Sequence, residues 1–403
     1  MESAPDEFIR YKYPQLLDDS RRAIADVLRV PQDTVVFVPN ATNAINAILR
    51  NMQWNSDRRD EIIYFDTIYG ACGKTIKYMV DSCYGYVSSR AICLEYPCED
   101  NDVVAWFREA VAVSKAAGRR PRLCVYDTVS SVPGVRFPFE ILTATCKELG
   151  VMSIVDGAQG VGMIEPNLSH LDPDFFFSNC HKWLHVPRGC AVLYVPLRNQ
   201  SYMVSTLPTS HGYVPRTGLP LTSGSTATGK NPFIKNFEGM GTVDNSPYLC
   251  VKDSIKWRRE VLGGEETIMK YTTSLAKQGG EQVARALGTE VMDNSTRTLT
   301  NCAMVNVRLP LNATQHSSSE EAAVVAGDFQ LDEAVAVSEW MMRTLVDDYR
   351  TFIVVYQHAQ NMWVRLSSQV YLDLEDFEWA GRILAELCER VKQAEWRTTR
   401  VGA

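Results

Sequence analysis

The stretch that decides the fold covers residues 153–195, SIVDGAQGVGMIEPNLSHLDPDFFFSNCHKWLHVPRGCAVLYV. It contains two short apolar runs, 153–155 and 175–177. The first run ends at the acid Asp156, and the second is soon followed by Lys182. Short apolar runs of this kind are typical of buried strands in an α/β sheet, where chemistry gathers at the strand ends. We therefore expect Asp156 and Lys182 to emerge at one edge of a sheet.

A carboxylate and an amine placed in this way suit pyridoxal 5′-phosphate (PLP). The amine of Lys182 can bind the aldehyde carbon of the cofactor covalently, and Asp156 can keep the pyridine nitrogen protonated. The protonated ring then accepts electrons from a substrate carbanion. From spacing alone, the alternative is a buried aspartate and a surface lysine that happen to follow strands.

The rest of the chain alternates strand and helix patterns, as a doubly wound sheet requires. Strands are predicted at 35–38, 62–65, 123–127 and 191–195, and helices at 14–30, 106–117 and 138–149. From about residue 246, helical stretches and three further strands indicate a second, smaller domain. The predicted organisation is an N-terminal helical segment at 1–30, a large α/β domain at 31–245 and a small C-terminal α+β domain at 246–403.

Composition excludes several classes of protein. The 403 residues carry a net charge of −7 and no basic run, which argues against nucleic acid or an anionic membrane as a partner. No segment is apolar enough to span a membrane, and the acidic first residues do not resemble a signal peptide. The 11 cysteines are odd in number and lack a C-x-x-C pair, so free thiols in a cytoplasmic protein are expected, with no metal site.

Two further stretches place polar groups directly after predicted strands. Residues 39–43, PNATN, precede a helical pattern, so the N–H groups at Ala41 and Thr42 can bind an anion, with simple N-capping as the alternative. Tyr69 follows the strand at 62–65 and can cover a cofactor ring or donate a proton, although a surface tyrosine is the alternative.

The motifs VDGAQ and NCHKW resemble the class V aminotransferase family of fold-type I PLP enzymes. Asparagine in place of serine three residues before the lysine is more similar to the isopenicillin-epimerase-like branch than to the desulfurases. The resemblance implies a large, mostly parallel-sheet domain with helices on both faces, a small α+β C-terminal domain, and a homodimer that shares its active sites.

The resemblance also implies roles for individual residues. Lys182 would carry the cofactor and move the α proton of the substrate, and Asp156 would face the pyridine nitrogen. Other residues expected at the cofactor are Gln159, His181, Asn179, Ala41, Thr42, Tyr69, Ser131 and, for the neighbouring subunit, Thr242. His185 has no role in the family and is interpreted as structural.

Two residues are candidates for substrate binding. Arg365 lies between apolar strand residues and can hold a carboxylate through two parallel hydrogen bonds, with a structural ion pair as the alternative. His211 lies in a Gly-, Ser-, Thr- and Pro-rich loop at 206–230, where it can either reach the active site or remain solvated.

The stretches YFDTIYGACGKT, VSSVPGVRFPFE, STLPTSHGYVP and GTVDNSP are similar to a fungal subgroup, the C–S lyases of ergothioneine biosynthesis. These enzymes cleave hercynylcysteine sulfoxide, so the resemblance implies β-elimination at sulfur that yields pyruvate, ammonia and a sulfur-bearing product, with Tyr69 as proton donor. Alternatives are a loline-type cyclase, an epimerase or aminotransferase, and a non-catalytic binding subunit with the same fold. Members of this branch also begin with an Asn-His-Gly segment that is expected ahead of Met1, and a site without it would lose substrate contacts.

Overall fold

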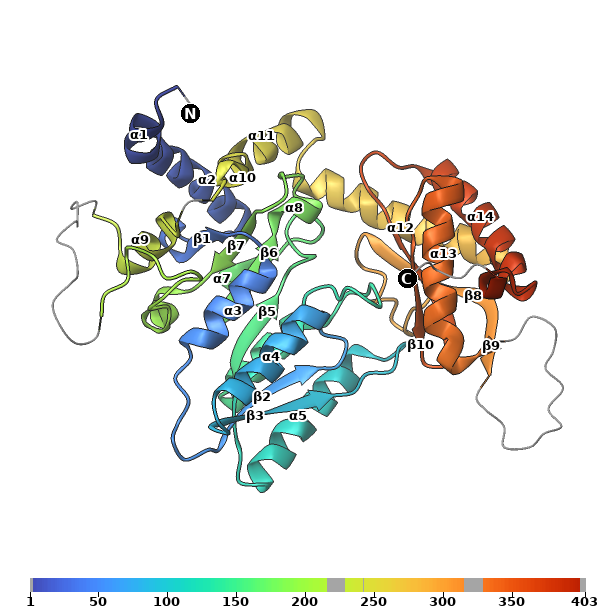
Figure 1. The fold of residues 1–403 in the computed structure, drawn as a ribbon, viewed down its shortest axis with the longest axis horizontal. Coiled ribbons are helices and arrows are strands. Elements are labelled where there is room, and N and C mark those ends of the chain that lie inside the picture. Colours follow the sequence, from blue (N-terminus) through green and yellow to red (C-terminus); the bar gives the residue numbers. More distant parts are fainter. Residues whose placement is uncertain (1–2, 216–228, 242, 315–328, 399–403) are drawn as a thin grey trace. The chain divides into compact units, whose positions relative to one another are not determined.

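The computed structural model describes residues 3–215, 229–241, 243–314 and 329–398. The chain forms two compact units, which are drawn in Figure 1. The large unit comprises Met1–Cys93, Val103–Val129 and Pro138–Glu266. The small unit comprises Leu94–Asp102, Ser130–Phe137 and Thr267–Ala403.

The large unit is built on a seven-stranded sheet in which one strand runs against the others. In sheet order the strands are β1 (Val35–Val38), β7 (Ala191–Tyr194), β6 (Phe175–Asn179), β5 (Met152–Asp156), β4 (Arg120–Asp127), β2 (Asp60–Phe65) and β3 (Val87–Ile92). β7 pairs antiparallel with both β1 and β6, and the remaining pairs are parallel. The predicted, mostly parallel sheet is therefore confirmed.

Helices cover both faces of this sheet, as predicted. Neighbouring residues of β4 show the two faces: Val125 packs in the apolar core formed with α3 and α4, whereas the Tyr126 hydroxyl hydrogen-bonds Thr143 of α6 at 2.8 Å. Successive side chains of a strand point to opposite faces, so α6 lies on the face away from α3 and α4. The main helices of this unit are α2 (Tyr13–Leu28), α3 (Ala41–Asn51), α4 (Gly70–Ser82), α5 (Asp100–Ala116), α6 (Phe139–Leu149), α10 (Ser246–Leu249) and α11 (Val251–Val261).

The large unit extends beyond the predicted domain boundary at 245–246. α10 and α11 pack on α2, and the Ser20 hydroxyl of α2 donates to the Leu249 carbonyl at 3.2 Å. α12 (Glu265–Leu287) begins in the large unit and continues in the small one. The boundary between the two compact units thus lies near the start of α12, because tertiary packing joins α10 and α11 to the N-terminal helix α2.

The small unit has one apolar core between a four-stranded sheet and three long helices (Figure 1). The sheet order is β10 (Val354–His358), β11 (Asn361–Ser367), β8 (Met304–Thr314) and β9 (Phe329–Gln330), and the helices are α12, α13 (Ala334–Tyr349) and α14 (Leu374–Lys392). Shorter helical elements of the chain are α1 (Pro5–Glu7), η1 (Phe8–Lys12), η2 (Gln32–Thr34), α7 (Leu168–Leu171), α8 (Cys180–Trp183), η3 (Leu197–Tyr202), α9 (Pro232–Glu238), η4 (Leu331–Glu333) and α15 (Glu395–Thr398).

Close packing of α12 on α14 gives a first prediction. A Cβ at Gly279 would lie 2.3 Å from the ring of Phe377, so Gly279→Ala forces this ring to move. We expect a loss of about 1–3 kcal/mol in the free energy of unfolding, because overpacking outweighs the higher helix propensity of alanine. Urea unfolding measures the loss. The control is Gln278→Ala on the exposed side of α12, and equal midpoints for the two variants would contradict the prediction.

Candidate active site

The carboxyl ends of six strands lie at one edge of the large sheet. β1 and β6 point the same way because both run against β7, and β5, β4, β2 and β3 are parallel to β6. Asp156 ends β5, and Lys182 lies in α8, directly after β6. The predicted acid and amine thus follow neighbouring strands at this edge.

Asp156 is held by two donors from different parts of the chain. It is 1% exposed, and its Oδ1 accepts the Ala158 N–H at 2.8 Å. Its Oδ2 accepts the thiol of Cys72, on α4, at 3.4 Å. Burial raises the pKa of Asp156, although these two hydrogen bonds and the positive charge of Lys182 oppose the shift. A buried carboxylate of this kind favours a cationic partner.

A second buried acid, Asp127, lies directly opposite Asp156 at the end of β4. Burial and the negative charge of Asp156 raise the pKa of Asp127 well above its usual range, although Lys182 lowers it in part. The sequence analysis assigned Asp127 no role. The signal was present, because Asp127 ends an apolar strand just as Asp156 does.

Lys182 and Tyr69 come together from different strand ends. The Nζ atom of Lys182 lies 6.0 Å from the ring centroid of Tyr69, at the edge of the range for a cation–π contact. Tyr69 precedes α4 and is 48% exposed. Beside them, the Oε1 of Gln159 accepts the indole N–H of Trp183 at 2.8 Å and links the acid loop to the lysine turn.

The N-terminus of α3 keeps one backbone donor available at the same edge. The Ala41 N–H donates to Oδ1 of Asn179 at 2.9 Å, and the Asn43 N–H donates to Oδ1 of Asn40 at 2.9 Å. Within the described residues the Thr42 N–H has no such bond, and the Thr42 hydroxyl lies beside it in sequence. The capping alternative is thus observed for Ala41 and Asn43, whereas Thr42 keeps donors for the predicted anion, and Asn179 caps the helix that the sequence predicted as a phosphate site.

His181 is oriented by the turn after the lysine. Its Nδ1 lies 2.8 Å from the carbonyl oxygen of Cys190, which can only accept, so Nδ1 carries the proton. Burial lowers the pKa of His181, and the charges of Lys182 and Arg188 add to this effect, while the bond to Cys190 opposes it. The imidazole is thus held neutral, with Nε2 as its second polar atom.

Two predicted site residues, Arg365 and Ser131, belong to the small unit. Nη1 of Arg365 donates to the carbonyl oxygen of Ser131 at 2.6 Å and lies 3.4 Å from its hydroxyl. Nε of Arg365 is buried without a hydrogen-bond partner within the described part of the chain. Ser131 thus supports Arg365. His211 is exposed, and Thr242 lies outside the described residues.

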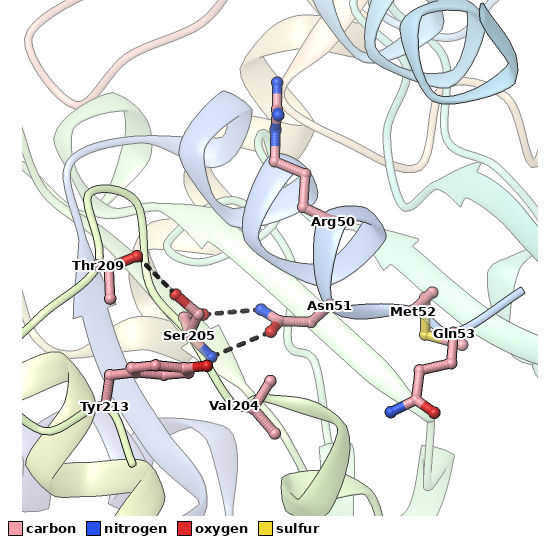
Figure 2. A pocket seen from close by; sticks show the side chains of 8 residues that line it. All are labelled: Arg50, Asn51, Met52, Gln53, Val204, Ser205, Thr209 and Tyr213. Carbon is pink, nitrogen blue, oxygen red and sulfur yellow. Dashed lines mark hydrogen bonds between the residues drawn. The ribbon is translucent and has the colours of Figure 1, made fainter. Parts of the chain in front are cut away.

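A cavity of about 470 Å³ opens at the other end of α3, away from these groups (Figure 2). The side chain of Asn51 closes one wall by two hydrogen bonds to the backbone of Ser205, at 2.7 and 3.0 Å. Arg50, Thr209 and Tyr213 also line it. None of the predicted site residues contributes to this cavity, so it is distinct from the candidate active site.

Three general findings concern only the residues that the structure describes. No helix among them is long and apolar enough to cross a membrane. They contain no group of three or more His, Cys, Asp or Glu side chains that could hold a metal ion. All eleven cysteines lie among them, and all are free thiols.

The polar groups at this edge fit both ends of PLP. Asp156 offers a buried carboxylate for a cationic ring nitrogen, and Thr42 offers donors at a helix N-terminus for a phosphate. The hydroxyl oxygen of Thr128, next to Asp127, is buried without a hydrogen bond in the described residues. Such an orphaned polar atom is expected where a ligand supplies the partner.

The buried acid at Asp127 gives a pH-dependent prediction for the cofactor-free protein. An unfolded aspartate titrates near pH 4, whereas native Asp127 holds its proton to higher pH, so unfolding releases a proton in that window. Between the two pKa values, rising pH therefore destabilises the wild type through this group by up to ~1.4 kcal/mol per pH unit.

Asp127→Asn cannot titrate, so its stability relative to the wild type should increase with pH across that window. Urea unfolding at a series of pH values measures the difference. The exposed Asp332→Asn variant serves as the control. A stability difference between Asp127→Asn and wild type that is independent of pH from 4 to 9 would refute the raised pKa.

Comparisons with known proteins agree with this geometry. The family model described as "Aminotransferase class-V" matches residues 10–85 and 98–328. An L-cysteine desulfhydrase-like protein of Epichloe uncinata, lolT1, is 36% identical over 98% of this chain and 88% of its own length. The hercynylcysteine sulfoxide lyase of Schizosaccharomyces pombe is 29% identical over 96% of this chain and 88% of its own.

A solved structure, the cystine C–S lyase C-DES in complex with cysteine persulfide, has the same fold. Its TM-score is 0.67 at 18% identity, and the match covers 94% of this chain and 87% of that one. The expected fold type is thus confirmed. On the family match, this chain belongs to the class-V aminotransferase family, and its cofactor is PLP.

Proposed function

We propose that this chain is a C–S lyase that catalyses β-elimination on a cysteine-conjugate sulfoxide of the hercynylcysteine type. The observation that carries the proposal is the pairing of the Lys182 amine with the Tyr69 ring, beside the buried acid Asp156. An amine and a phenol are two proton-transfer groups, and β-elimination needs one proton removed at Cα and one supplied to sulfur.

PLP, when bound, supplies an electron sink that stabilises negative charge at the substrate Cα. Lys182 would hold the cofactor and, once displaced by the substrate amine, remove the α proton. Asp156 would hold the ring nitrogen protonated, Thr42 and Ala41 would hold the phosphate with His181 and Asn179 beside them, and Gln159 would bind the phenolic oxygen.

The bond that breaks joins Cβ of the substrate to sulfur. The electron pair of the Cα–H bond forms a Cα–Cβ double bond, and sulfur leaves with the Cβ–S pair and takes a proton from the Tyr69 hydroxyl. A sulfoxide substrate gives a sulfenic acid and 2-aminoacrylate, and water converts the latter to pyruvate and ammonia. The exposure of Tyr69 leaves room for a bulky group on sulfur.

Arg365 would hold the substrate carboxylate. Support comes from its buried Nε, which has no partner among the described residues, and from Ser131, which accepts at Nη1 and so fixes the plane of the guanidinium. A planar fork with free donors suits a carboxylate. For His211 and Thr242 we propose substrate contact and phosphate contact across a homodimer, respectively, as the family resemblance implies.

The substrate class rests on relatives rather than on geometry. One relative is named for hercynylcysteine sulfoxide, and several others are named as L-cysteine desulfhydrases. The lolT relatives, at 36% identity, are named L-cysteine desulfhydrase-like proteins. Cyclisation is the second candidate, as the resemblance to loline-type cyclases implies. We propose a cytoplasmic enzyme, in keeping with its free thiols.

The assay that tests the function uses purified protein saturated with PLP. Wild type should show a visible absorption band that borohydride removes, whereas Lys182→Ala should not, because it lacks the amine. Incubation of wild type with hercynylcysteine sulfoxide should release equimolar pyruvate and ammonia, and L-cysteine serves as the comparison substrate. A product without pyruvate would favour cyclisation or epimerisation, and a colourless wild type would overturn the proposal.

Replacement of Arg365 tests the carboxylate contact. Arg365→Lys keeps the charge but loses the fork, so we expect kcat/KM to fall by about 10²-fold, as loss of a charge-assisted pair of ~3 kcal/mol predicts. The matched control is Arg308→Lys, a half-buried arginine of the same sheet that pairs with Glu290. Equal kcat/KM for Arg365→Lys and wild type would assign Arg365 a structural role only.

A further inference from the structure

Arg258, on α11, has the largest side chain that is fully buried in this structure. Buried arginines are costly unless every charge and donor is satisfied. Here all five N–H groups of the guanidinium are used, and their acceptors lie on the two loops that follow β5 and β6 and at the start of α12. We propose that Arg258 is a positioning residue that holds the lysine turn in register with the acid loop.

The first contacts join the two loops directly. Nη1 of Arg258 donates to the carbonyl oxygen of Trp183, the residue after Lys182, at 2.8 Å. Nη2 donates to the carbonyl oxygen of Gly162, in the loop that follows Asp156, at 3.1 Å. One planar group thus binds the main chain of both loops.

The two loops also touch without a side chain between them. Gly162 has φ +86°, and a Cβ there would lie 2.5 Å from the Trp183 carbonyl oxygen. A residue other than glycine would therefore push this carbonyl away from Arg258. The close approach makes the position of the lysine turn depend on the acid loop.

The guanidinium is itself fixed by a carboxylate. Glu265, the first residue of α12, accepts from Nε and Nη2 through its two oxygens, both at 2.6 Å. This bidentate pair compensates the buried charge and sets the plane of the fork. Nη1 also donates to Nδ1 of His185 at 2.9 Å, so that Nδ1 is the unprotonated nitrogen of the imidazole.

Lysine cannot replace Arg258 in this geometry. An ammonium offers three donors from one nitrogen, whereas the acceptors here surround a planar fork. Displacement of the Trp183 carbonyl moves the adjacent Lys182, and a shift of about 1 Å at a reacting group can cost about 10²-fold in rate. This inference rests on the proposed role of Lys182, and Arg258 acts through Lys182 without touching the substrate.

The test compares Arg258→Lys and Glu265→Gln with Arg259→Lys, whose side chain on the same helix is exposed. Four readouts are taken: PLP affinity of the stripped protein, the pH midpoint of the visible band of the PLP-loaded protein, α-proton exchange of L-alanine in D2O, and urea unfolding. For Arg258→Lys and Glu265→Gln we expect PLP affinity to fall about tenfold and α-proton exchange to slow about 10- to 100-fold. We also expect the pH midpoint of the visible band to move by about 0.5 unit or more. Arg259→Lys should match wild type in all four.

If Arg258 has only a structural role, Arg258→Lys and Glu265→Gln lower the urea midpoint but leave PLP affinity and exchange rate within about twofold of wild type, and the pH midpoint unchanged. That result overturns the proposal. If Arg258→Lys does not fold, Glu265→Gln decides by the same criteria, because it keeps Arg258 and the shape of its partner. A wild type without a borohydride-reducible band would instead refute the proposed function, which separates the two failures.

Discussion

The hydrogen bond from the Gly157 N–H to the Phe177 carbonyl, at 2.7 Å, continues the β5–β6 ladder one residue beyond Asp156. The chain can make it only with glycine at this position, because a Cβ would lie 2.4 Å from the ring of Phe176. This bond fixes the register between the strand that ends in the acid and the strand that leads to Lys182. Since a sheet places alternate residues on opposite faces, a slip of one residue would turn the acid away from the site.

On the other side of β5, the β4–β5 register brings two acids together, and this shapes the electrostatics of the edge. Asp127 and Asp156 are paired in the ladder and both are buried. Burial raises the pKa of both, and the charge of Asp156 raises that of Asp127 further. Cys72 adds a neutral thiol donor, because burial and the charges of Asp156 and Asp127 raise its pKa and disfavour the thiolate. Lys182 is a cation that acts on all three groups. A cationic ring nitrogen beside Asp156 would add positive charge at this edge, and its binding should stabilise the native state.

Periodicity in the sequence predicted the helices and strands whose apolar face can be recognised from their own residues. The bounds of β1 agree with the predicted strand at 35–38, and those of α6 agree with the predicted helix at 138–149 to within one residue. β3 was not predicted, because it is an edge strand with the polar centre SSR. From about residue 246 the prediction was helical but assigned to the small domain, whereas α10 and α11, which meet at Cys250, pack on α2 of the large unit.

The residues of the candidate site could be predicted where they belong to a local sequence motif, but not where tertiary packing brings them to the site. Asp156 and Lys182 follow apolar strands and could be identified locally. Arg258 could not, because it lies in the run KWRRE of an amphipathic helix, where a charged residue normally faces solvent. Arg258 is buried where it donates to the backbone carbonyls of Trp183 and Gly162, which follow two strand ends. The position of these carbonyls cannot be predicted from the residues around Arg258.

The proposed reaction also requires the substrate carboxylate to be held while Lys182 removes the proton from Cα. In sequence, the support of Arg365 follows soon after the buried acid Asp127. Only Thr128, Val129 and Ser130 separate the buried Asp127 from Ser131, whose carbonyl oxygen fixes Arg365. The Thr128 N–H donates to the Asp156 carbonyl at 2.9 Å, so this short segment is anchored to the acid strand at its start. This bond therefore fixes the main chain directly after Asp127, and the segment that leads on to Ser131 starts from a defined position on the sheet.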